Sequence, residues 1–207
     1  MIGAGPAGLM AAEELAKSGL VVWVVDAKPS FGRKFLMAGK SGLNLTKSEA
    51  QETFQAQFHA AQAPLRPMLD AFGPTQVAAW ATGLGQALFT GTTGRVFPTA
   101  MKASPLLRSW LERLDTLGVV RKTRWRWTGW EDGSLQFDTP QGRVSLNPKA
   151  TVLALGGGSW ARLGSDGKWV EHLQKQGISL APFQPANTGL LVDWSPHMAR
   201  HFGQPLK

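Results

Sequence analysis

The chain has 207 residues, a formal net charge of +8, nine tryptophans, and neither cysteine nor tyrosine. Without cysteine, the residues given form no disulfide bond or thiolate metal site and no dithiol flavoenzyme, because a thiolate is the nucleophile of that class. The lack of tyrosine excludes a short-chain dehydrogenase, which needs a catalytic Tyr ahead of a Lys.

Length and hydropathy further narrow the class of protein. A chain of this length can form one large domain or two small ones with a real core. No stretch of the sequence is apolar for long enough to span a membrane, and no basic-then-apolar leader is visible, so we expect a cytoplasmic protein without a membrane partner. The positive charge suits nucleic acid, a membrane surface or an anionic cofactor, but a solvated basic surface is the simpler explanation.

A G-x-G-x-x-G motif occupies residues 3–8 and opens a predicted helix over about 6–18. In a dinucleotide-binding βαβ unit Gly3 permits the tight turn, Gly5 leaves room for a pyrophosphate, and Gly8 lets helix and strand pack closely. The N-terminus of the helix would face the phosphates with unpaired N–H groups and the positive end of its dipole.

The apolar run 21–25 then ends at Asp26, close to the spacing expected of an acid that accepts hydrogen bonds from an adenosine ribose. Strand, helix and acid in this order predict dinucleotide binding. Only Met1 and Ile2 precede the motif, so the first strand of the unit is truncated relative to a usual length of about 5 residues. We therefore expect a fragment, short at both ends; an intact small protein that begins abruptly is the alternative.

The second strand is followed by a segment rich in glycine and cations, residues 31–42, and then by a helical insertion over about 48–117. Helices are expected within the insertion at about 48–63, 75–82 and 104–117. For the last of these, Ser104 is the expected N-cap and Pro105 the first helical position.

Beyond the insertion the hydrophobic period changes to that of strands, which predicts a β-meander over about 119–147. Its three strands are expected at 119–130, 135–137 and 143–146. The apolar run 151–155 is typical of a strand buried in a parallel sheet, and it ends at Gly156 and Gly157. A short helix is expected over about 167–176.

Two patterns suggest other ligands but have simpler explanations. Residues 121–127 interleave cations with aromatics, as in sites for single-stranded nucleic acid. In a strand, however, the tryptophans would face one side and Arg124 and Arg126 the other, so nucleic acid is not an expected partner. His197 and His201 are spaced i, i+4, but the Glu of H-E-x-x-H is absent, and no metal site is predicted.

The order of these elements predicts an α/β fold: a Rossmann-like domain with a parallel sheet, a helical insertion and a three-stranded meander crossover. The same order resembles the two-dinucleotide-binding-domain flavoproteins, in which such a domain binds FAD. Within that group, residues 32–39 and 43–46 look like the G-R-K-x-L-x-S-G-x-G-R-C-N-x-T segment of the BaiN-like flavoproteins, also labelled the aminoacetone oxidase family. Similarity to later signatures of that family is found at 95–98, 102–104, 155–160 and 164–167.

The chain departs from the family pattern at 41–43, where Ser-Gly-Leu replaces Gly-Arg-Cys, so a role of that Arg or Cys is not transferred and the chain looks like a divergent subfamily. Family members are about twice as long. The resemblance therefore implies an FAD-binding domain over 1–180 and, over 181–207, the start of a second domain that is mostly missing.

The resemblance also implies which residues bind FAD. Residues of the glycine motif would bind the pyrophosphate and Asp26 the ribose, while Arg33 and Lys34 would contact phosphate or ribose unless they lie on a solvated loop. Trp127 would touch adenine through its backbone. The implied FAD-binding residues are Gly3, Gly5, Pro6, Ala7, Gly8, Asp26, Ala27, Arg33, Lys34, Gly39, Gly42, Asn44, Trp127, Gly156 and Gly157. No catalytic residue is readable.

The function implied is that of an FAD-dependent oxidoreductase that uses NAD(P)H to reduce a small organic substrate through the flavin, with an oxidase as the second possibility. An NAD-dependent dehydrogenase would use the same βαβ unit, although the meander and the Gly156-Gly157 return argue against it. The sequence also leaves open a non-catalytic cofactor-binding or RNA-associated protein and an inactive truncated product.

Overall fold

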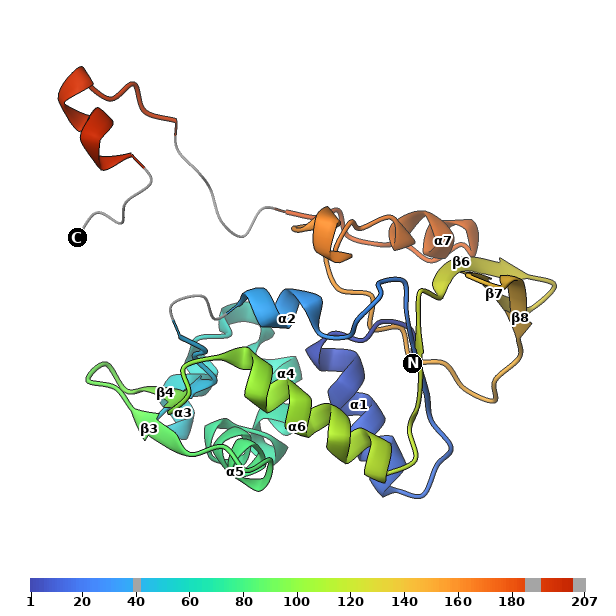
Figure 1. Ribbon diagram of the computed structural model, residues 1–207, viewed down its shortest axis with the longest axis horizontal. Coiled ribbons are helices and arrows are strands. Elements are labelled where there is room, and N and C mark those ends of the chain that lie inside the picture. The colour runs from blue at the N-terminus through green and yellow to red at the C-terminus, as the bar shows by residue number, and fades with distance from the viewer. Residues whose placement is uncertain (39–41, 185–190, 203–207) are drawn as a thin grey trace.

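The computed structural model describes residues 1–38, 42–184 and 191–202 (Figure 1). A parallel sheet forms its centre: β1 (Trp23–Asp26) pairs with β5 (Val120–Thr123), and Ile2 makes single parallel bridges to Val25 on one side and Leu153 on the other. Ile2 therefore lies in the middle of the sheet, between β1 and Leu153.

The run 151–155 was expected to be a strand buried in the parallel sheet. It joins that sheet through a parallel bridge to Ile2, but it forms no extended strand and is only partly buried. Within the described part of the chain it pairs only through Leu153 and the backbone around it, and Thr151 and Val152 are exposed. Ile2 offers it too short a partner to extend the ladder, and the segment lies at the edge of the described sheet, where its apolar side chains are only partly covered.

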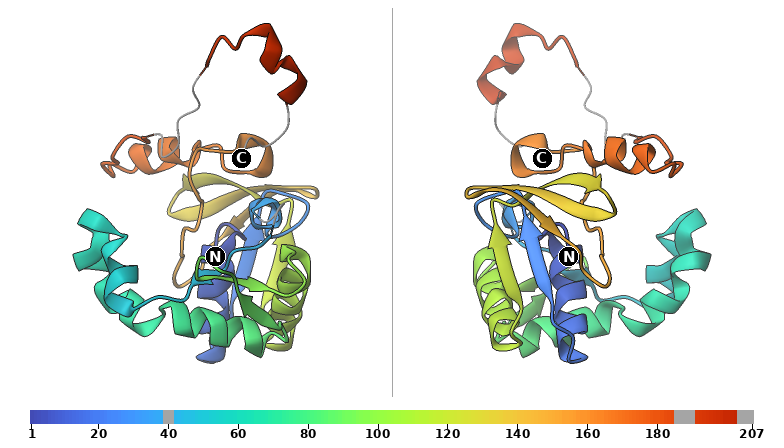
Figure 2. Two further views of the ribbon diagram at one scale, coloured as in Figure 1. Left: turned by 90° about the vertical axis from the view of Figure 1, so that its left-hand side faces the viewer. Right: turned by 90° about the vertical axis from the view of Figure 1, so that its right-hand side faces the viewer.

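Side chains of the sheet alternate between two apolar cores. Val22 and Val24 belong to a core shared with α1 (Pro6–Lys17) and α6 (Ala103–Thr116). Ile2 and Val25 belong to a second core, shared with the meander. The sheet is therefore covered by helices on one face and by the meander on the other, as Figure 2 shows from two sides.

The predicted meander is confirmed as β6 (Arg126–Glu131), β7 (Ser134–Thr139) and β8 (Gly142–Leu146), which pair in antiparallel order. Its expected first strand, 119–130, is in fact two strands, because β5 belongs to the parallel sheet. Arg124 separates them with φ +60°, and its N–H donates to the Lys28 carbonyl at 3.0 Å. The expected alternation of tryptophan and arginine is interrupted at this turn.

The insertion is helical, as predicted, but two of its segments also form, with the residues just before it, a small antiparallel sheet that the sequence did not indicate. The order of that sheet is β2 (Thr46–Lys47), β4 (Arg95–Pro98) and β3 (Leu88–Thr90). The remaining helices are α2 (Arg33–Met37), α3 (Gln51–Ala56), η1 (His59–Ala61), α4 (Gln62–Ala71), α5 (Pro74–Gly83), η2 (Ala161–Leu163), α7 (Trp169–Lys175) and η3 (Pro196–His201).

Two helix boundaries differ from expectation. The single helix expected over about 48–63 is divided into α3, η1 and the start of α4, and α4 continues to Ala71 despite Pro67 within it. The N-cap of α6 is Lys102, whose backbone is extended, so Ser104 lies inside the first turn. Pro105 is tolerated there because the first N–H groups of a helix have no intrahelical acceptor. None of the helices in the described ranges is long and apolar enough to cross a membrane.

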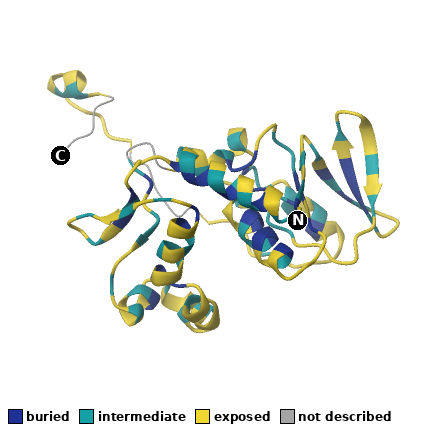
Figure 3. Cartoon of the chain, turned by 60° about the horizontal axis from the view of Figure 1, so that its bottom comes forward, coloured by how far each residue is buried: buried dark blue, intermediate teal, exposed yellow. Residues whose placement is uncertain are grey.

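Glu13 anchors α1 to the insertion from inside the first core, where its side chain is fully buried. Its carboxylate accepts hydrogen bonds from the indole N–H groups of Trp80 (3.1 Å) and Trp110 (2.7 Å) and pairs with Arg113 (2.9 Å) and Lys17 (2.7 Å). Burial alone would raise the pKa of Glu13, but the bonds from Lys17, Arg113 and Trp80 lower it below its ordinary value. The glutamate is therefore held as a carboxylate. Figure 3 shows the buried residues of α1 beside exposed ones on the same helix.

Candidate functional site

A cavity of about 1140 Å³ lies where the carboxyl end of β1, the start of α1, α2, β6 and α7 meet. Figure 1 shows α7 beside β6 on this side of the molecule. Open α/β sheets bind ligands at the carboxyl ends of their strands, and this cavity has that position. Of the implied FAD-binding residues, those that line it are Gly3, Gly5, Pro6, Ala7, Asp26, Ala27, Arg33, Lys34, Trp127 and Gly156.

The glycines of the motif have different surroundings. A Cβ on Gly3, which has φ +103°, would collide with the Ala154 carbonyl oxygen and lie 2.8 Å from its carbon. A Cβ on Gly8 would collide with the Gly3 carbonyl oxygen and lie 3.2 Å from the Ala154 Cβ. A Cβ on Gly5 would meet no atom within 4 Å. Packing therefore explains Gly3 and Gly8, whereas at Gly5 a Cβ would take up space in the cavity.

The N-terminus of α1 borders the cavity, with Gly5 as N-cap and Pro6 at the first helical position. Its first turn carries no acidic side chain. The free N–H groups and the positive dipole end of a helix N-terminus attract anions. This edge of the cavity therefore suits a phosphate group.

The Asp26 carboxylate links the end of β1 to the glycine turn. One oxygen accepts the N–H of Ala4 and the other the N–H of Lys28, both at 2.8 Å. A carboxylate oxygen accepts more than one hydrogen bond, so both oxygens retain capacity for the hydroxyl groups of a ribose. The two backbone bonds fix the orientation in which the carboxylate meets a ligand.

Charge in the cavity is predominantly positive, with five basic side chains against three acidic ones. The basic residues are Lys28, Arg33, Lys34, Arg126 and Lys168, and the acidic ones are Asp26, Asp166 and Glu171. Lys34 reaches across to the loop after Gly156, where its ammonium donates to the hydroxyls of Ser159 (2.7 Å) and Ser165 (3.3 Å). Such a lining suits a ligand with negative charge.

Three buried polar atoms of the described residues have no hydrogen-bond partner: Arg33 Nε, Trp127 Nε1 and Thr128 Oγ1. All three belong to residues that line the cavity. Leaving a buried donor or acceptor unpaired costs about 1–3 kcal/mol, so a ligand that paired with these atoms after a movement of their side chains would be stabilised. The glycine turn, the Asp26 carboxylate, the cations and these atoms together fit a dinucleotide such as FAD.

The rest of the implied FAD-binding residues do not line this cavity. Gly8 lies beneath the glycine turn, and Gly157 follows Gly156 just outside the lining. Gly42 approaches Met101, and Asn44 is exposed. Gly39 lies outside the described residues. Their roles toward FAD stay predictions.

Sequence reasoning missed several residues of the lining, above all those of α7. Trp169, whose indole N–H donates to the Gly156 carbonyl at 3.0 Å, and His172, whose ring meets Trp127 at 5.1 Å, come from this helix. The apolar pattern of α7 predicted a helix but gave no indication of where it would pack. Lys28 and Thr128 were missed because loop and bulge residues carry no periodic signal.

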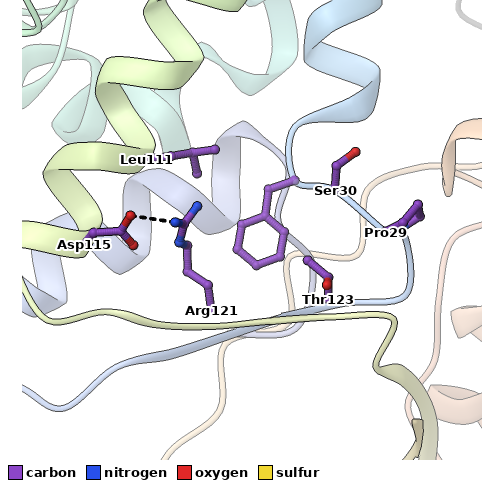
Figure 4. Close-up of a pocket in the computed structure, with 7 residues that line it drawn as sticks. Pro29, Ser30, Leu111, Asp115, Arg121 and Thr123 are labelled. Carbon is purple, nitrogen blue, oxygen red and sulfur yellow. Dashed lines mark hydrogen bonds and ion pairs between the residues drawn. The ribbon is translucent and has the colours of Figure 1, made fainter. Parts of the chain in front are cut away.

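A second, smaller cavity of about 560 Å³ lies between β5, α6 and the loop after β1 (Figure 4). Its charged residues, Arg121 and Asp115, pair with each other at 2.6 Å. The remaining lining residues are Pro29, Ser30, Phe31, Leu111 and Thr123. Because its two charged side chains pair with each other, this cavity offers a ligand fewer free charged groups than the larger cavity does.

The sequence profile of the HI0933-like protein Rossmann domain matches residues 1–189. A protein of Clostridium scindens named 3-dehydro-bile acid delta(4,6)-reductase is 27% identical over 201 residues, which are 95% of this chain and 48% of that protein. The chain thus spans about half the length of the curated relative it matches.

Solved structures share the fold. The 3-ketosteroid-delta4-(5alpha)-dehydrogenase of Rhodococcus jostii aligns with a TM-score of 0.56 at 16% identity, over 75% of this chain and 45% of the other. A flavocytochrome c3 fumarate reductase aligns with a TM-score of 0.56 at 22% identity, over 75% and 33%. These likenesses confirm the predicted Rossmann-like fold.

Proposed function

Because the chain belongs to the HI0933-like family of FAD-dependent Rossmann domains, we propose that its larger cavity binds FAD and that the protein acts as a flavin-dependent oxidoreductase. The observation that carries this proposal is the set of groups that meet at one cavity: a glycine turn, a helix N-terminus, an oriented carboxylate and an excess of basic side chains. A common dinucleotide ligand accounts for all of them.

Each part of the cavity then has a role in holding the cofactor. Gly5 and the first turn of α1 bind the pyrophosphate, and Asp26 accepts the ribose hydroxyls. Arg33 and Lys34 add positive charge near the phosphates. Bound FAD supplies the hydride chemistry, and this chain supplies binding, orientation and electrostatics.

We further propose that the reaction is an NAD(P)H-linked reduction of a small organic substrate. The relative from Clostridium scindens is named a reductase, which supports reduction over oxidation. The division into an FAD-binding domain over 1–180 and a second domain from 181, and a cytoplasmic location, stay predictions.

Anaerobic mixing of the FAD-loaded chain with NADH and with NADPH tests this reaction. We expect one of the two to bleach the visible flavin absorbance, and reoxidation to follow when an acceptor is added. Bleaching by neither nucleotide, while dithionite still bleaches the bound flavin, would contradict the NAD(P)H half-reaction but leave FAD binding intact.

A further inference from the structure

Residues 158–167 form a loop that closes on itself at one wall of the larger cavity. Positions 163–166 of this loop line the cavity. Two backbone hydrogen bonds between Trp160 and Ser165, at 3.0 and 3.1 Å, tie its middle together. In Figure 1 the loop, in orange, lies beside α2, to which the ammonium of Lys34 bonds it. A compact loop that is bonded internally can move as one unit.

The two ends of the loop meet at a pair of glycines. A Cβ on Gly158 would lie 3.9 Å from the Gly167 Cα, and a Cβ on Gly167 would lie 3.4 Å from the Gly158 Cα. Gly167 has φ +68°, a backbone conformation that favours glycine. The loop therefore has a narrow neck, and small changes of backbone angle there would swing the whole loop.

The ring of Phe183 lies on this neck. Its nearest carbon is 3.5 Å from the Cβ position of Gly158 and 2.8 Å from that of Gly167, so the ring fills space that side chains at both glycines would need. The same ring meets Trp169 edge to face, with 5.7 Å between the centroids. Trp169 in turn donates its indole N–H to the Gly156 carbonyl. Phe183 thus joins both ends of the loop to the start of α7.

The contact of Phe183 with the neck is local. Its side chain does not line the larger cavity, it is 53% exposed, and it belongs to neither apolar core of the described residues. Part of its ring is covered by the two glycines and Trp169. Burial of apolar surface favours the arrangement in which this contact is made. Because the contact lies outside both cores, its loss would free the loop without unfolding the chain.

We infer that Phe183 is a positioning residue: it holds the neck of the loop 158–167 closed and so keeps this wall of the larger cavity in place. Without Phe183 the loop opens more often, and a ligand enters and leaves the cavity faster. The hold on the loop is a property of the chain by itself, whereas its effect on FAD exchange rests on the proposed function.

Limited trypsin digestion of the full chain without ligand tests the hold on the loop. Arg162 is exposed within the loop, and cleavage after it requires the loop to open into the protease. Phe183→Ala should raise the initial rate of this cleavage about 5-fold, the effect of losing a half-buried apolar side chain. Phe183→Leu, which keeps most of the apolar contact, should restore most of the protection. Mass spectrometry of fragments that begin at Leu163 measures the rate.

An internal reference and a matched variant separate loop opening from general destabilisation. Lys149 is exposed in the connection after β8, outside the loop, and cleavage after it should not change in Phe183→Ala. Phe89→Ala is the matched variant, because Phe89 is 43% exposed, stacks on Phe97 at 5.6 Å and lies outside the lining of the cavity. An unchanged rate at Arg162 in Phe183→Ala would overturn the inference. Equal acceleration at Arg162 and Lys149, or equal acceleration at Arg162 in Phe89→Ala, would do the same.

The dissociation rate of FAD extends the test to the cavity. After dilution of the complex, flavin fluorescence should show FAD leaving Phe183→Ala faster than wild type and Phe89→Ala, by a factor similar to that of the cleavage. If FAD binds and the loop opens faster but FAD leaves at the wild-type rate, control of the cavity by Phe183 is wrong and the proposed function stands. If FAD does not bind to the folded wild type, the proposed function fails, and the digestion alone decides whether Phe183 holds the loop.

Discussion

At the scale of single residues, the glycine motif serves two different needs. Gly3 and Gly8 leave space for the chain itself, because a side chain at either would collide with a backbone carbonyl. Gly5 instead leaves space in the larger cavity, since a Cβ there would meet no atom within 4 Å. Substitution at these positions should therefore separate folding from ligand binding.

Gly5→Ala tests the ligand side of this distinction. The backbone at Gly5 is extended, with φ −81°, so alanine is accommodated and only the weaker N-cap preference of alanine should lower the free energy of unfolding, by less than about 1 kcal/mol. The added methyl group would occupy the space proposed for the pyrophosphate, and FAD affinity should fall at least about 10-fold. Chemical denaturation and calorimetric titration measure the two effects.

Gly8→Ala is the matched variant on the packing side. Its methyl group would collide with the Gly3 carbonyl, so we expect destabilisation of about 1–3 kcal/mol before any ligand is added. Equal stability of the two variants, with equal affinity for FAD, would contradict the division of roles.

Asp26→Asn tests the proposed ribose contact. Asparagine keeps one acceptor oxygen and loses the charge, so it can no longer accept both backbone N–H groups and both ribose hydroxyls. FAD affinity should fall about 10-fold, as expected for weakened hydrogen bonds to a charged acceptor. Asp166→Asn is the control, because Asp166 lines the same cavity with a single backbone contact at 3.2 Å among the described residues. The assignment is wrong if both variants lose affinity equally.

The motif residues could be predicted from sequence because each has a local geometric reason. Gly3 and Gly8 follow from the turn, and the oriented carboxylate of Asp26 follows from its place at the end of a strand. Thr128 could not be predicted, since its position in the cavity depends on a β-bulge that β6 forms opposite β7. The partners of Glu13 could not be predicted either, because Trp80 and Arg113 are distant in sequence and contact Glu13 only through helix packing.

At the scale of elements, α1 must be held firmly for its N-terminus to bind a ligand. Glu13 provides this anchor by joining α1 to Trp80 of α5 and to Trp110 and Arg113 of α6. The arrangement couples the phosphate-binding helix to the insertion. Removing the Glu13 charge would deprive two indole N–H groups and two partly exposed cations of their charged acceptor.

Glu13→Gln should lower the free energy of unfolding by about 1–2 kcal/mol at neutral pH, because the partners of Glu13 lose a charged acceptor but Lys17 and Arg113 are partly exposed. The folded-state pKa of Glu13 lies below its ordinary value. Its stabilising contribution is therefore complete above that ordinary value and is lost as pH falls toward the folded-state pKa. The difference between wild type and variant should narrow in acid, which denaturation curves across pH would measure.

Glu14→Gln is the control for this prediction. Glu14 is exposed and, within the described ranges, its carboxylate pairs only with Lys17, at 2.9 Å, so its loss should change stability by less than about 0.5 kcal/mol at any pH. A comparable loss in both variants would show that Glu13 has no special role.

Elements with a strong period were predictable, and those defined by distant pairing were not. The helical spacing of apolar residues made α6 predictable, and the turn residues between its strands made the meander predictable. The split between β5 and β6 was missed because a turn at Arg124 carries no glycine or proline. The sheet β2–β4–β3 was missed because its strands are short and pair across the intervening helices of the insertion.

At the scale of the whole molecule, two cores on opposite faces of one parallel sheet position the larger cavity. Helices α1 and α6 support the glycine turn from one side, and the meander supplies part of the lining from the other. The chain spans about half the length of its curated relative, so the substrate and the reaction of the whole protein are part of the proposed function. FAD binding is the claim that this chain can test by itself.

The visible absorption spectrum of the purified chain, with chromatography of any pigment released on denaturation, tests that claim most directly. The account predicts a flavin spectrum, either as purified or after addition of FAD, and release of FAD rather than FMN. A chain that is folded by circular dichroism, remains colourless and takes up no added FAD would contradict it.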